Sequence, residues 1–188
     1  KKIIKSKPNY INAYVNLGNL KRDSNDFNSA IELYTQALKI NKKNPVILYS
    51  IALAYQGLGK FRIAIEYAQR VLDIEPKFTQ ADSLISQSIK YEDGNKHFED
   101  MNLKVNNLEL DDHQKVNLLF ALAKANEDTN QIEKSFKNLS EGNQMKRRLI
   151  NFNINNEIKL FNQIKKIFGN MNKKEFIKKS IYDKNIIF

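Results

Sequence analysis

The amino-acid sequence predicts an all-α fold, an α-solenoid of antiparallel helix pairs that ends in capping or linker helices. The first observation is a repeat of 34 residues, so that the segment at 11–44 returns at 45–78. The second is that apolar residues within each segment recur at three- and four-residue steps, which is the spacing of one helix face. Such a helix pair buries its apolar face only by stacking on its neighbours, so we expect one elongated stack. The residue pairs that carry the repeat are Phe27 and Phe61, Ala30 and Ala64, Ile31 and Ile65, and Ile40 and Ile74.

The first repeat, at 11–44, is expected to contain two short helices. The residues between them, Asp, Ser and Asn at 23–26, favour turns and helix N-caps. Gly18 and Ala30 are small where the two helices should approach most closely. Because glycine inside a helix costs about 1 kcal/mol relative to alanine, we expect close packing to account for Gly18. Residues 1–10 are expected to be the end of a preceding repeat.

The second repeat, at 45–78, is expected to form helices at 46–58 and 61–74, and Pro76 prevents the latter from continuing. A third repeat, at 79–115, departs from the strict pattern and is degenerate. A break at the Asp-Gly-Asn sequence and a short helix after it, from His97 to Val105, are expected there. Its expected inner face consists of Ala81, Leu84, Ile85 and Ile89.

A fourth repeat, at 116–150, is displaced by a few residues from the strict period. Asp111 and Asp112 suit the N-terminus of its first helix, where acidic side chains complement the helix dipole. Residues 151–188 are expected to form linker or capping helices that lead to a further domain. The fourth repeat carries Leu119, Leu122, Ala123, Ile132, Ser135, Phe136 and Leu139 at the recurring positions.

The linker contains an amphipathic helix at 153–168, followed by a plausible stop at Gly169. A shorter helix is expected at 175–182, and the apolar ending at 185–188 is interpreted as the start of a strand. The apolar face of the longer helix consists of Ile154, Ile158, Phe161, Ile164, Ile167 and Phe168.

The repeat length and pattern resemble the tetratricopeptide repeat (TPR), which implies a right-handed TPR α-solenoid. Members of that family often bind peptides in a concave groove lined by the first helix of each repeat. In one version, cationic and amide side chains clamp the carboxylate tails of chaperones. Only Asn19 matches that clamp, so chaperone-tail binding is not predicted. The corresponding positions hold Val15, Asn19, Ser50, Gln80 and Leu84.

The groove is instead expected to be polar and neutral, and a peptide or a partner protein is the expected ligand. The alternative is that its residues are simply a solvated face. The groove candidates are Asn12, Asn16, Asn19, Tyr49 and Ser50.

The stretch at 120–168 resembles the linker region of bacterial TPR-sulfotransferases. The resemblance implies that the chain is the N-terminal, non-catalytic arm of an enzyme that uses 3′-phosphoadenosine-5′-phosphosulfate. Every catalytic residue would then lie beyond Phe188, and this part would hold no catalytic residue, cofactor or metal. The matching residues are Phe120, Ala121, Leu122, Lys124, Ala125, Glu127, Asp128, Ser135, Phe136, Leu139, Gly142, Asn143, Lys146, Arg147 and Phe152.

Two other functions stay open, a free-standing TPR adaptor that binds a peptide or partner protein and a basic binder of nucleic acid or anionic surfaces. The net charge of +10 is concentrated at 134–188, which holds 13 Lys or Arg against 4 Asp or Glu. Arginine, the usual residue for bidentate phosphate contacts, occurs only five times, which disfavours nucleic acid. The basic patch Lys146, Arg147 and Arg148 either offsets a helix dipole or faces the phosphates of the sulfate donor in the intact enzyme.

The composition excludes several kinds of site. The chain has no cysteine, so it has neither disulfides nor thiolate metal sites. Its two histidines, His97 and His113, lack partners at metal-ligand spacing, and no glycine-rich phosphate loop or nucleophile set is present. No apolar window of about 18 or more residues occurs, so no membrane span is expected. We expect a cytoplasmic protein whose partner is a protein, a peptide or the catalytic domain of its own parent.

Overall fold

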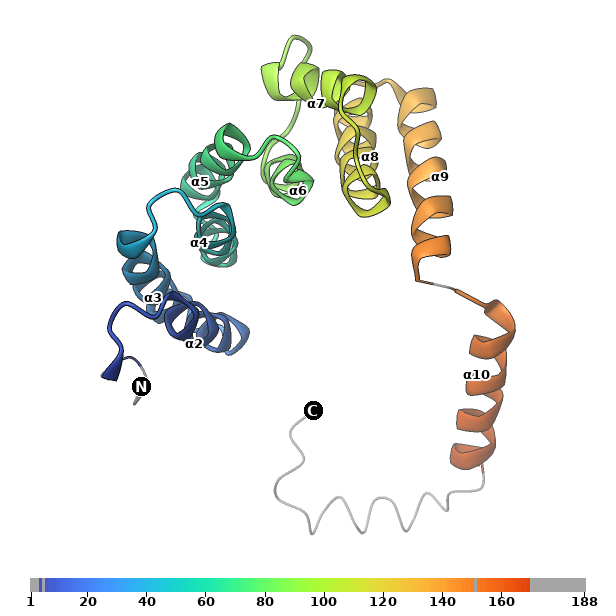
Figure 1. Ribbon diagram of the computed structural model, residues 1–188. Helices are drawn as coiled ribbons and strands as arrows, with labels where there is room; N and C mark the ends of the chain where they lie inside the picture. Colours follow the sequence, from blue (N-terminus) through green and yellow to red (C-terminus); the bar gives the residue numbers. More distant parts are fainter. Residues whose placement is uncertain (1–3, 5, 151, 170–188) are drawn as a thin grey trace. The chain divides into compact units, whose positions relative to one another are not determined.

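The computed structural model describes residues 4, 6–150 and 152–169, and the secondary structure of this described part is entirely helical. It divides into two compact units, one that ends at Leu149 and one that begins at Ile150. The expected fold class is confirmed, because the first unit is a stack of helices in which three pairs of successive helices pack closely, at 11–40, 45–74 and 112–149 (Figure 1). These helices are α2 (Ile11–Asp23), α3 (Phe27–Ile40), α4 (Pro45–Gly57), α5 (Phe61–Ile74), α6 (Thr79–Ser88), α7 (Lys96–Asn107), α8 (Asp112–Asp128) and α9 (Ile132–Leu149).

Short-range capping explains where several helices begin. The side chain of Asp26 accepts a hydrogen bond from the backbone N–H of Ser29, and this fixes the start of α3. Asn44 caps α4 in the same way through the N–H groups of Val46 and Ile47, and Pro45 occupies the first turn. The turns before α3 and α4 therefore lie where the sequence places Asp and Asn residues.

Close helix packing explains the glycine of the first pair. Gly18 lies beneath the ring of Tyr34, which is completely buried. A Cβ atom at position 18 would lie 2.5 Å from Cε1 of Tyr34, which is closer than real contacts allow. The expectation that Gly18 serves close packing is confirmed. Gly57 of α4 lies against Phe27 of α3 in the same manner.

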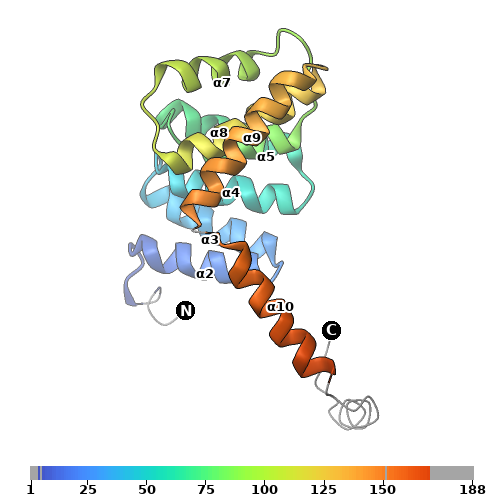
Figure 2. The same cartoon turned by 90° about the vertical axis from the view of Figure 1, so that its right-hand side faces the viewer.

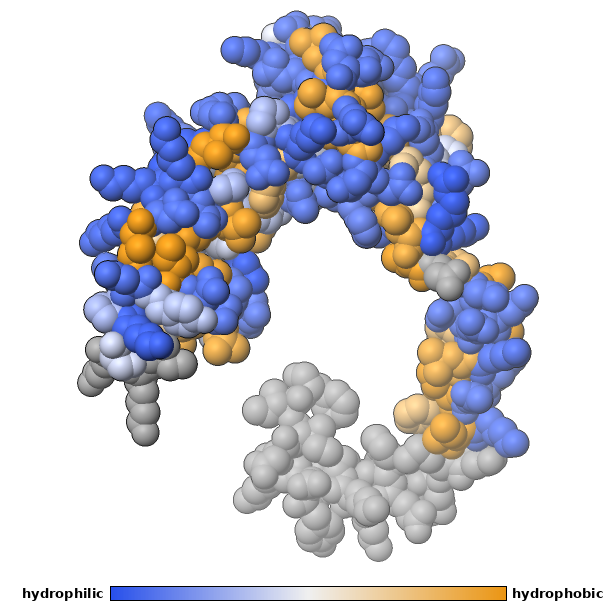
Figure 3. All heavy atoms as spheres, viewed as in Figure 1, coloured by the Kyte–Doolittle hydropathy of each residue, from blue (hydrophilic) through white to orange (hydrophobic). Residues whose placement is uncertain are grey.

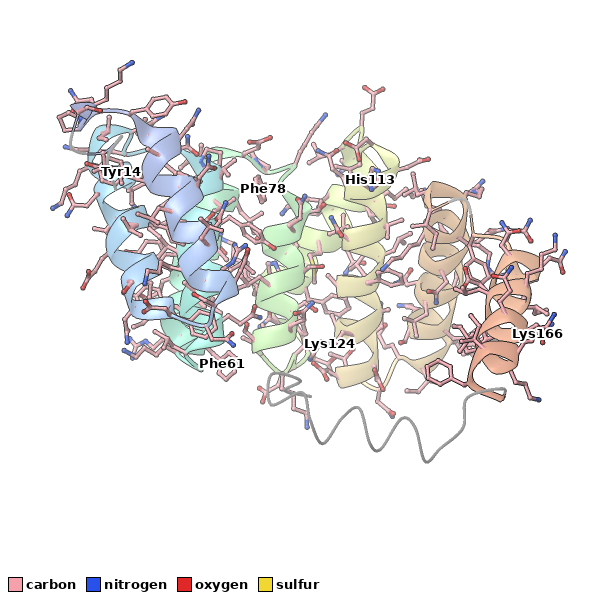
Figure 4. The ribbon with its side chains drawn as sticks, turned by 90° about the horizontal axis from the view of Figure 1, so that it is seen from below. Tyr14, Phe61, Phe78, His113, Lys124 and Lys166 are labelled. Atoms are coloured by element: carbon pink, nitrogen blue, oxygen red, sulfur yellow. The ribbon has the colours of Figure 1, made fainter. Side chains whose placement is uncertain are left out.

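The first helix of each pair follows the inner side of this unit. Helices α2, α4, α6 and α8 lie along the inner curve in Figure 1, with α3 and α5 outside them. Figure 4 shows Tyr14 of α2, Phe78 just before α6 and His113 of α8 near one edge, and Lys124 of α8 toward the opposite edge. The inner helices therefore run in the same direction, as stacked repeats require.

The third pair is irregular. α6 has only 10 residues and packs directly on α8, whereas α7 packs on α8 rather than beside α6. Small hydroxyl side chains permit this approach: Ser83 Oγ donates to the carbonyl of Asn117, and Ser86 Oγ donates to that of Ala121. The segment at 79–115, where the sequence departs from the strict repeat pattern, is therefore also the part in which the regular helix pairing is lost.

The fourth pair begins with a capping box. Asp111 accepts from the N–H of Gln114, and the Gln114 side chain accepts from the N–H of Asp111. Of the residues at recurring positions, Leu119, Leu122, Ala123 and Ser135 are buried. Ile132, Phe136 and Leu139 of α9 are exposed, Phe136 by 73%, because no further helix of this unit follows α9.

The second unit contains α10 (Ile154–Gly169). Its apolar residues share one face and are all exposed, which confirms the expected amphipathic helix. The expected helix at 175–182 and the apolar ending at 185–188 lie outside the described residues. Among the described residues, no helix combines the length and the apolar character that a membrane crossing requires.

Candidate functional site

The five groove candidates lie on α2 and α4, but the fold does not leave all of them available. Asn12 and Asn16 are exposed on α2. Asn19 is half-buried, and its Oδ1 accepts a 2.8 Å hydrogen bond from the hydroxyl of Tyr34. Ser50 is only 6% exposed, and its hydroxyl donates to the carbonyl of its own helix. Two asparagines therefore remain fully accessible, and Asn19 and Ser50 are used by the fold.

Tyr49 is half-buried, so it is neither as accessible as Asn12 and Asn16 nor as enclosed as Ser50. Its ring packs at a tilt on Phe78, with ring centroids 5.1 Å apart. Burial raises the pKa of the Tyr49 hydroxyl, so the group stays protonated at physiological pH and can donate a hydrogen bond.

The positions of the carboxylate clamp carry no cation. Val15 and Gln80 are neutral, and Leu84 is an apolar core residue of α6. Val15, Gln80 and Leu84 therefore offer no cationic side chain for a carboxylate tail.

A buried polar cluster lies around α6 and α7, and the sequence did not reveal it. The Asp82 side chain is fully buried. Lys104 Nζ lies 2.7 Å and 2.9 Å from its two carboxylate oxygens, and His97 Nε2 lies 3.0 Å from Oδ1. The other ring nitrogen of His97 lies 2.8 Å from the hydroxyl of Tyr91. His97 thus has a carboxylate partner, but one 15 residues away, which no spacing rule identifies.

This cluster stabilises the fold rather than offering reactive groups. Tyr91 is buried, and burial raises the pKa of its hydroxyl far above the usual range. Within the described residues, every buried side-chain nitrogen and oxygen atom has a hydrogen-bond partner. No group of three potential metal ligands is present in that part of the chain either. The cluster therefore joins α6, the following loop and α7.

A second set of polar contacts fixes that loop to α8. Lys124 Nζ donates to the carbonyl of Ile89 and to Asp128, and Asp128 also accepts a 2.9 Å bond from the N–H of Tyr91. Burial opposes ionisation of Asp128, but its hydrogen bonds from Lys124 and Tyr91 and the charges of Lys124 and Lys90 outweigh it, so its pKa is lowered. Lys124 and Asp128 were both part of the sulfotransferase resemblance, and both have a packing role here.

The basic patch at the end of α9 is exposed, but part of it also has a structural partner. Lys146 Nζ lies 5.6 Å from the centre of the Phe120 ring, within the range of a cation–π contact. A Cβ atom at Gly142 would lie 3.0 Å from the same ring. Phe120, Gly142 and Lys146 therefore form one contact between α8 and α9.

A pocket of about 660 Å³ lies between α7, α8 and α9. The sequence did not indicate it, because it depends on the displacement of α7. Residues from all three helices and from the turn before α9 line it: Phe98, Asn102, Val105, Asn106, Lys115, Leu119, Leu122, Asn126, Gln131, Lys134, Lys137, Asn138 and Glu141.

Comparison with known protein families identifies the central part of the chain. A TPR repeat model matches residues 18–59, and a tetratricopeptide repeat model matches residues 46–78. The matched segment at 18–78 therefore carries tetratricopeptide repeats.

Two curated fungal proteins are similar over part of the chain. The heat-shock protein cognate co-chaperone sgt12 of Aspergillus fumigatus is 38% identical over 64 residues, which cover 34% of this chain. The small glutamine-rich tetratricopeptide repeat-containing protein 2 of Mycosarcoma maydis is 32% identical over 72 residues, or 38% of this chain. The match spans only 19% and 20% of these two relatives, respectively.

Solved structures share the fold over more of the chain. The crystal structure of MamA has a TM-score of 0.61 and 16% identity, and the match covers 81% of this chain and 87% of MamA. YrrB, described as a TPR protein with an unusual peptide-binding site, has a TM-score of 0.56 and 15% identity, with 77% and 73% covered. At these identities the likeness concerns the fold alone.

Proposed function

We propose that this chain is a TPR adaptor that binds a peptide or a segment of a partner protein on the inner face of α2 and α4. The observation that carries the proposal is that Asn12 and Asn16, one helical turn apart on α2, are both exposed and make no side-chain hydrogen bond within the described part of the chain. The TPR matches at 18–78 support it, since the curated relatives are named as a co-chaperone and as a TPR-containing protein.

The chemistry of this face suits an uncharged peptide segment. An asparagine side chain offers two donors and an acceptor, which is the complement of a peptide backbone. The Tyr49 hydroxyl adds a donor, and its ring adds apolar surface. Because the clamp positions carry no cation, the affinity would not depend on a terminal carboxylate.

The comparisons support the adaptor reading better than the sulfotransferase reading. Neither the family matches nor the relatives named above are sulfotransferases. The residues that suggested one, notably Phe120 and Gly142, make contacts between α8 and α9 that explain their presence. Use of 3′-phosphoadenosine-5′-phosphosulfate by a parent enzyme remains a prediction.

The test is a selection from a random peptide library on the full chain, followed by affinity measurements on two matched variants. Asn16→Arg changes the inner face, and Gln36→Arg adds the same charge at an exposed position of α3. We expect Asn16→Arg to weaken the selected peptides about tenfold, equivalent to about 1.4 kcal/mol, and Gln36→Arg to leave them unchanged. Peptides that bind both variants with the wild-type affinity would contradict the inner-face site.

A further inference from the structure

The displacement of α7 opens a groove, defined here as the 660 Å³ pocket between α7, α8 and α9. In the regular repeats, the second helix of a pair packs closely on the first helix of the next pair, as α3 does on α4. Figure 2 shows α7 and α9 running in different directions rather than side by side. Residues of α8 line the groove together with residues of these two helices. The volume falls in the range of about 300–1,000 Å³ that is usual for ligand sites.

The floor of the groove is apolar. Leu119 and Leu122 of α8 form it, and Phe98 and Val105 of α7 form the adjacent wall. The two leucines are buried, whereas Phe98 and Val105 are half-buried and leave apolar surface open. Figure 3 shows apolar surface over α7 and α8 set among hydrophilic side chains. Such a floor favours an apolar side chain of a ligand over water.

The α9 rim is cationic. Lys134 and Lys137 are exposed on successive turns of α9, and Lys134 donates to the side-chain oxygen of Gln131, a neutral group. Lys115 is also on the rim, but its charge is paired with Glu141 at 3.0 Å. Within the described residues, neither Lys134 nor Lys137 has a carboxylate partner. The groove therefore presents two positive charges that its own residues do not neutralise.

The third component is a set of asparagine side chains. The Nδ2 groups of Asn102, Asn106 and Asn126 each donate to a backbone carbonyl one turn earlier in the same helix. The side-chain oxygens of Asn102 and Asn106, which are exposed, are thereby left as acceptors, which suits the N–H groups of an extended peptide. Along α8 the groove runs from Lys115 to Asn126, about 16 Å at 1.5 Å per residue. An extended peptide covers that length with about five residues.

We propose that this groove binds an acidic peptide segment that also carries apolar side chains, as a second site distinct from the inner face. Its apolar side chains would pack on the open surface of Phe98 and Val105, its carboxylates would pair with Lys134 and Lys137, and its backbone would donate to Asn102 and Asn106. The chain's own residues at 150–188 contain more lysines than carboxylates, so they do not fit this description. A nucleic acid fits less well, because the groove lining contains no arginine and only one aromatic ring, Phe98.

The experiment measures binding of labelled peptides of about seven residues to the full chain by fluorescence anisotropy, with lengths chosen to exceed the groove. One peptide alternates glutamate and valine, a second alternates lysine and valine, and a third alternates glutamate and serine. We expect the first to bind at least tenfold more tightly than either of the others. Equal affinity for the first two would overturn the charge argument, and equal affinity for the first and third would overturn the role of the apolar floor.

Matched charge reversals locate the site. Lys134→Glu with Lys137→Glu changes the rim, and Lys42→Glu with Lys43→Glu makes the same change in net charge at exposed positions outside the groove. The rim variant should bind the acidic peptide about tenfold more weakly than the wild-type chain. The control variant should lose less than about twofold when both are measured at the same salt concentration. Equal losses in both variants would overturn the site, as would tighter binding of a single-stranded oligonucleotide than of the acidic peptide.

The two proposals can be tested independently of each other. The inner-face variant Asn16→Arg should leave acidic-peptide binding in the groove unchanged, because it lies on α2. Loss of groove binding in that variant would show that the acidic peptide binds the inner face, and it would overturn the groove proposal without contradicting the adaptor.

Discussion

Lys104 Nζ lies 2.7 Å from the Oδ1 atom of Asp82 and joins α7 to the fully buried carboxylate of α6. Together with His97, the other partner of Asp82, which also lies on α7, this ion pair helps to fix α7 against α6. The position of α7 in turn creates the groove on α8.

Replacing Lys104 should therefore destabilise the fold strongly. Lys104→Met leaves the Asp82 carboxylate buried with only His97 as a charged or ionisable partner, and removal of one member of a buried pair costs about 3–5 kcal/mol. We expect a loss of about 3 kcal/mol in the free energy of unfolding, measured with urea. The exposed Lys39→Met serves as the control and should change it by less than about 0.5 kcal/mol. A loss below about 1 kcal/mol for Lys104→Met would show that the pair contributes little.

Gly18 should tolerate no large side chain. Gly18→Leu forces atoms into the ring of Tyr34, which is buried and cannot move without disturbing the core of the first pair. Overpacking of this kind costs about 1–3 kcal/mol and sometimes more. The matched variant Asn16→Leu lies on the exposed side of the same helix and should change stability by less than about 0.5 kcal/mol. Thermal unfolding of the two variants tests the difference, and equal melting temperatures would refute the packing account.

The capping box of α8 should contribute measurably to stability. Asp111→Ala removes the acceptor for the Gln114 N–H and leaves that donor without its partner. Loss of an N-cap side chain typically costs about 1 kcal/mol. Glu109→Ala, at an exposed position just before the cap, should have an effect of only a few tenths of a kcal/mol. Urea unfolding at neutral pH compares the two variants. Equal losses of stability would contradict a specific contribution of the Asp111 cap.

Asp128 should make the free energy of unfolding depend on pH. Its pKa is lowered in the folded state, so its charged form stabilises the fold at pH values above its unfolded-state pKa of about 4. That contribution is lost as the pH falls through the lower folded-state value. Asp128→Asn should therefore cost about 1–2 kcal/mol at pH 7 and progressively less below pH 4. Unfolding curves for both proteins between about pH 7 and pH 3 provide the measurement. A difference between them that does not change with pH would contradict this role.

The regular part of the fold could be predicted because its determinants are local. Asp26 and Asp111 act on N–H groups three residues away, and Gly18 recurs in the repeat frame as a small residue. The buried cluster could not be predicted in this way. Asp82 meets His97 and Lys104 only because α7 leaves the repeat pattern, and no periodic signal records that departure.

The inner face shows a different limit of sequence reasoning. Helical spacing correctly places Asn12, Asn16 and Asn19 on one helix, but it does not show which side chains the fold already uses. The Asn19 oxygen is taken by Tyr34, and the Ser50 hydroxyl is taken by its own backbone. The groove on α8 was also hidden, because residues from three helices line it.

Direct packing of α6 on α8 means that the continuity of the stack does not pass through α7. Local opening of α7 would break its contacts with Asp82 but would leave the contact between α6 and α8 in place, so we expect it to cost less free energy than global unfolding. Backbone amides of α7 should then exchange with solvent deuterium sooner than those in the middle of α8. α7, which forms one wall of the groove, would thus be the helix of the central stack least protected from hydrogen exchange. The width of the groove would then depend on the equilibrium between the closed and open positions of α7.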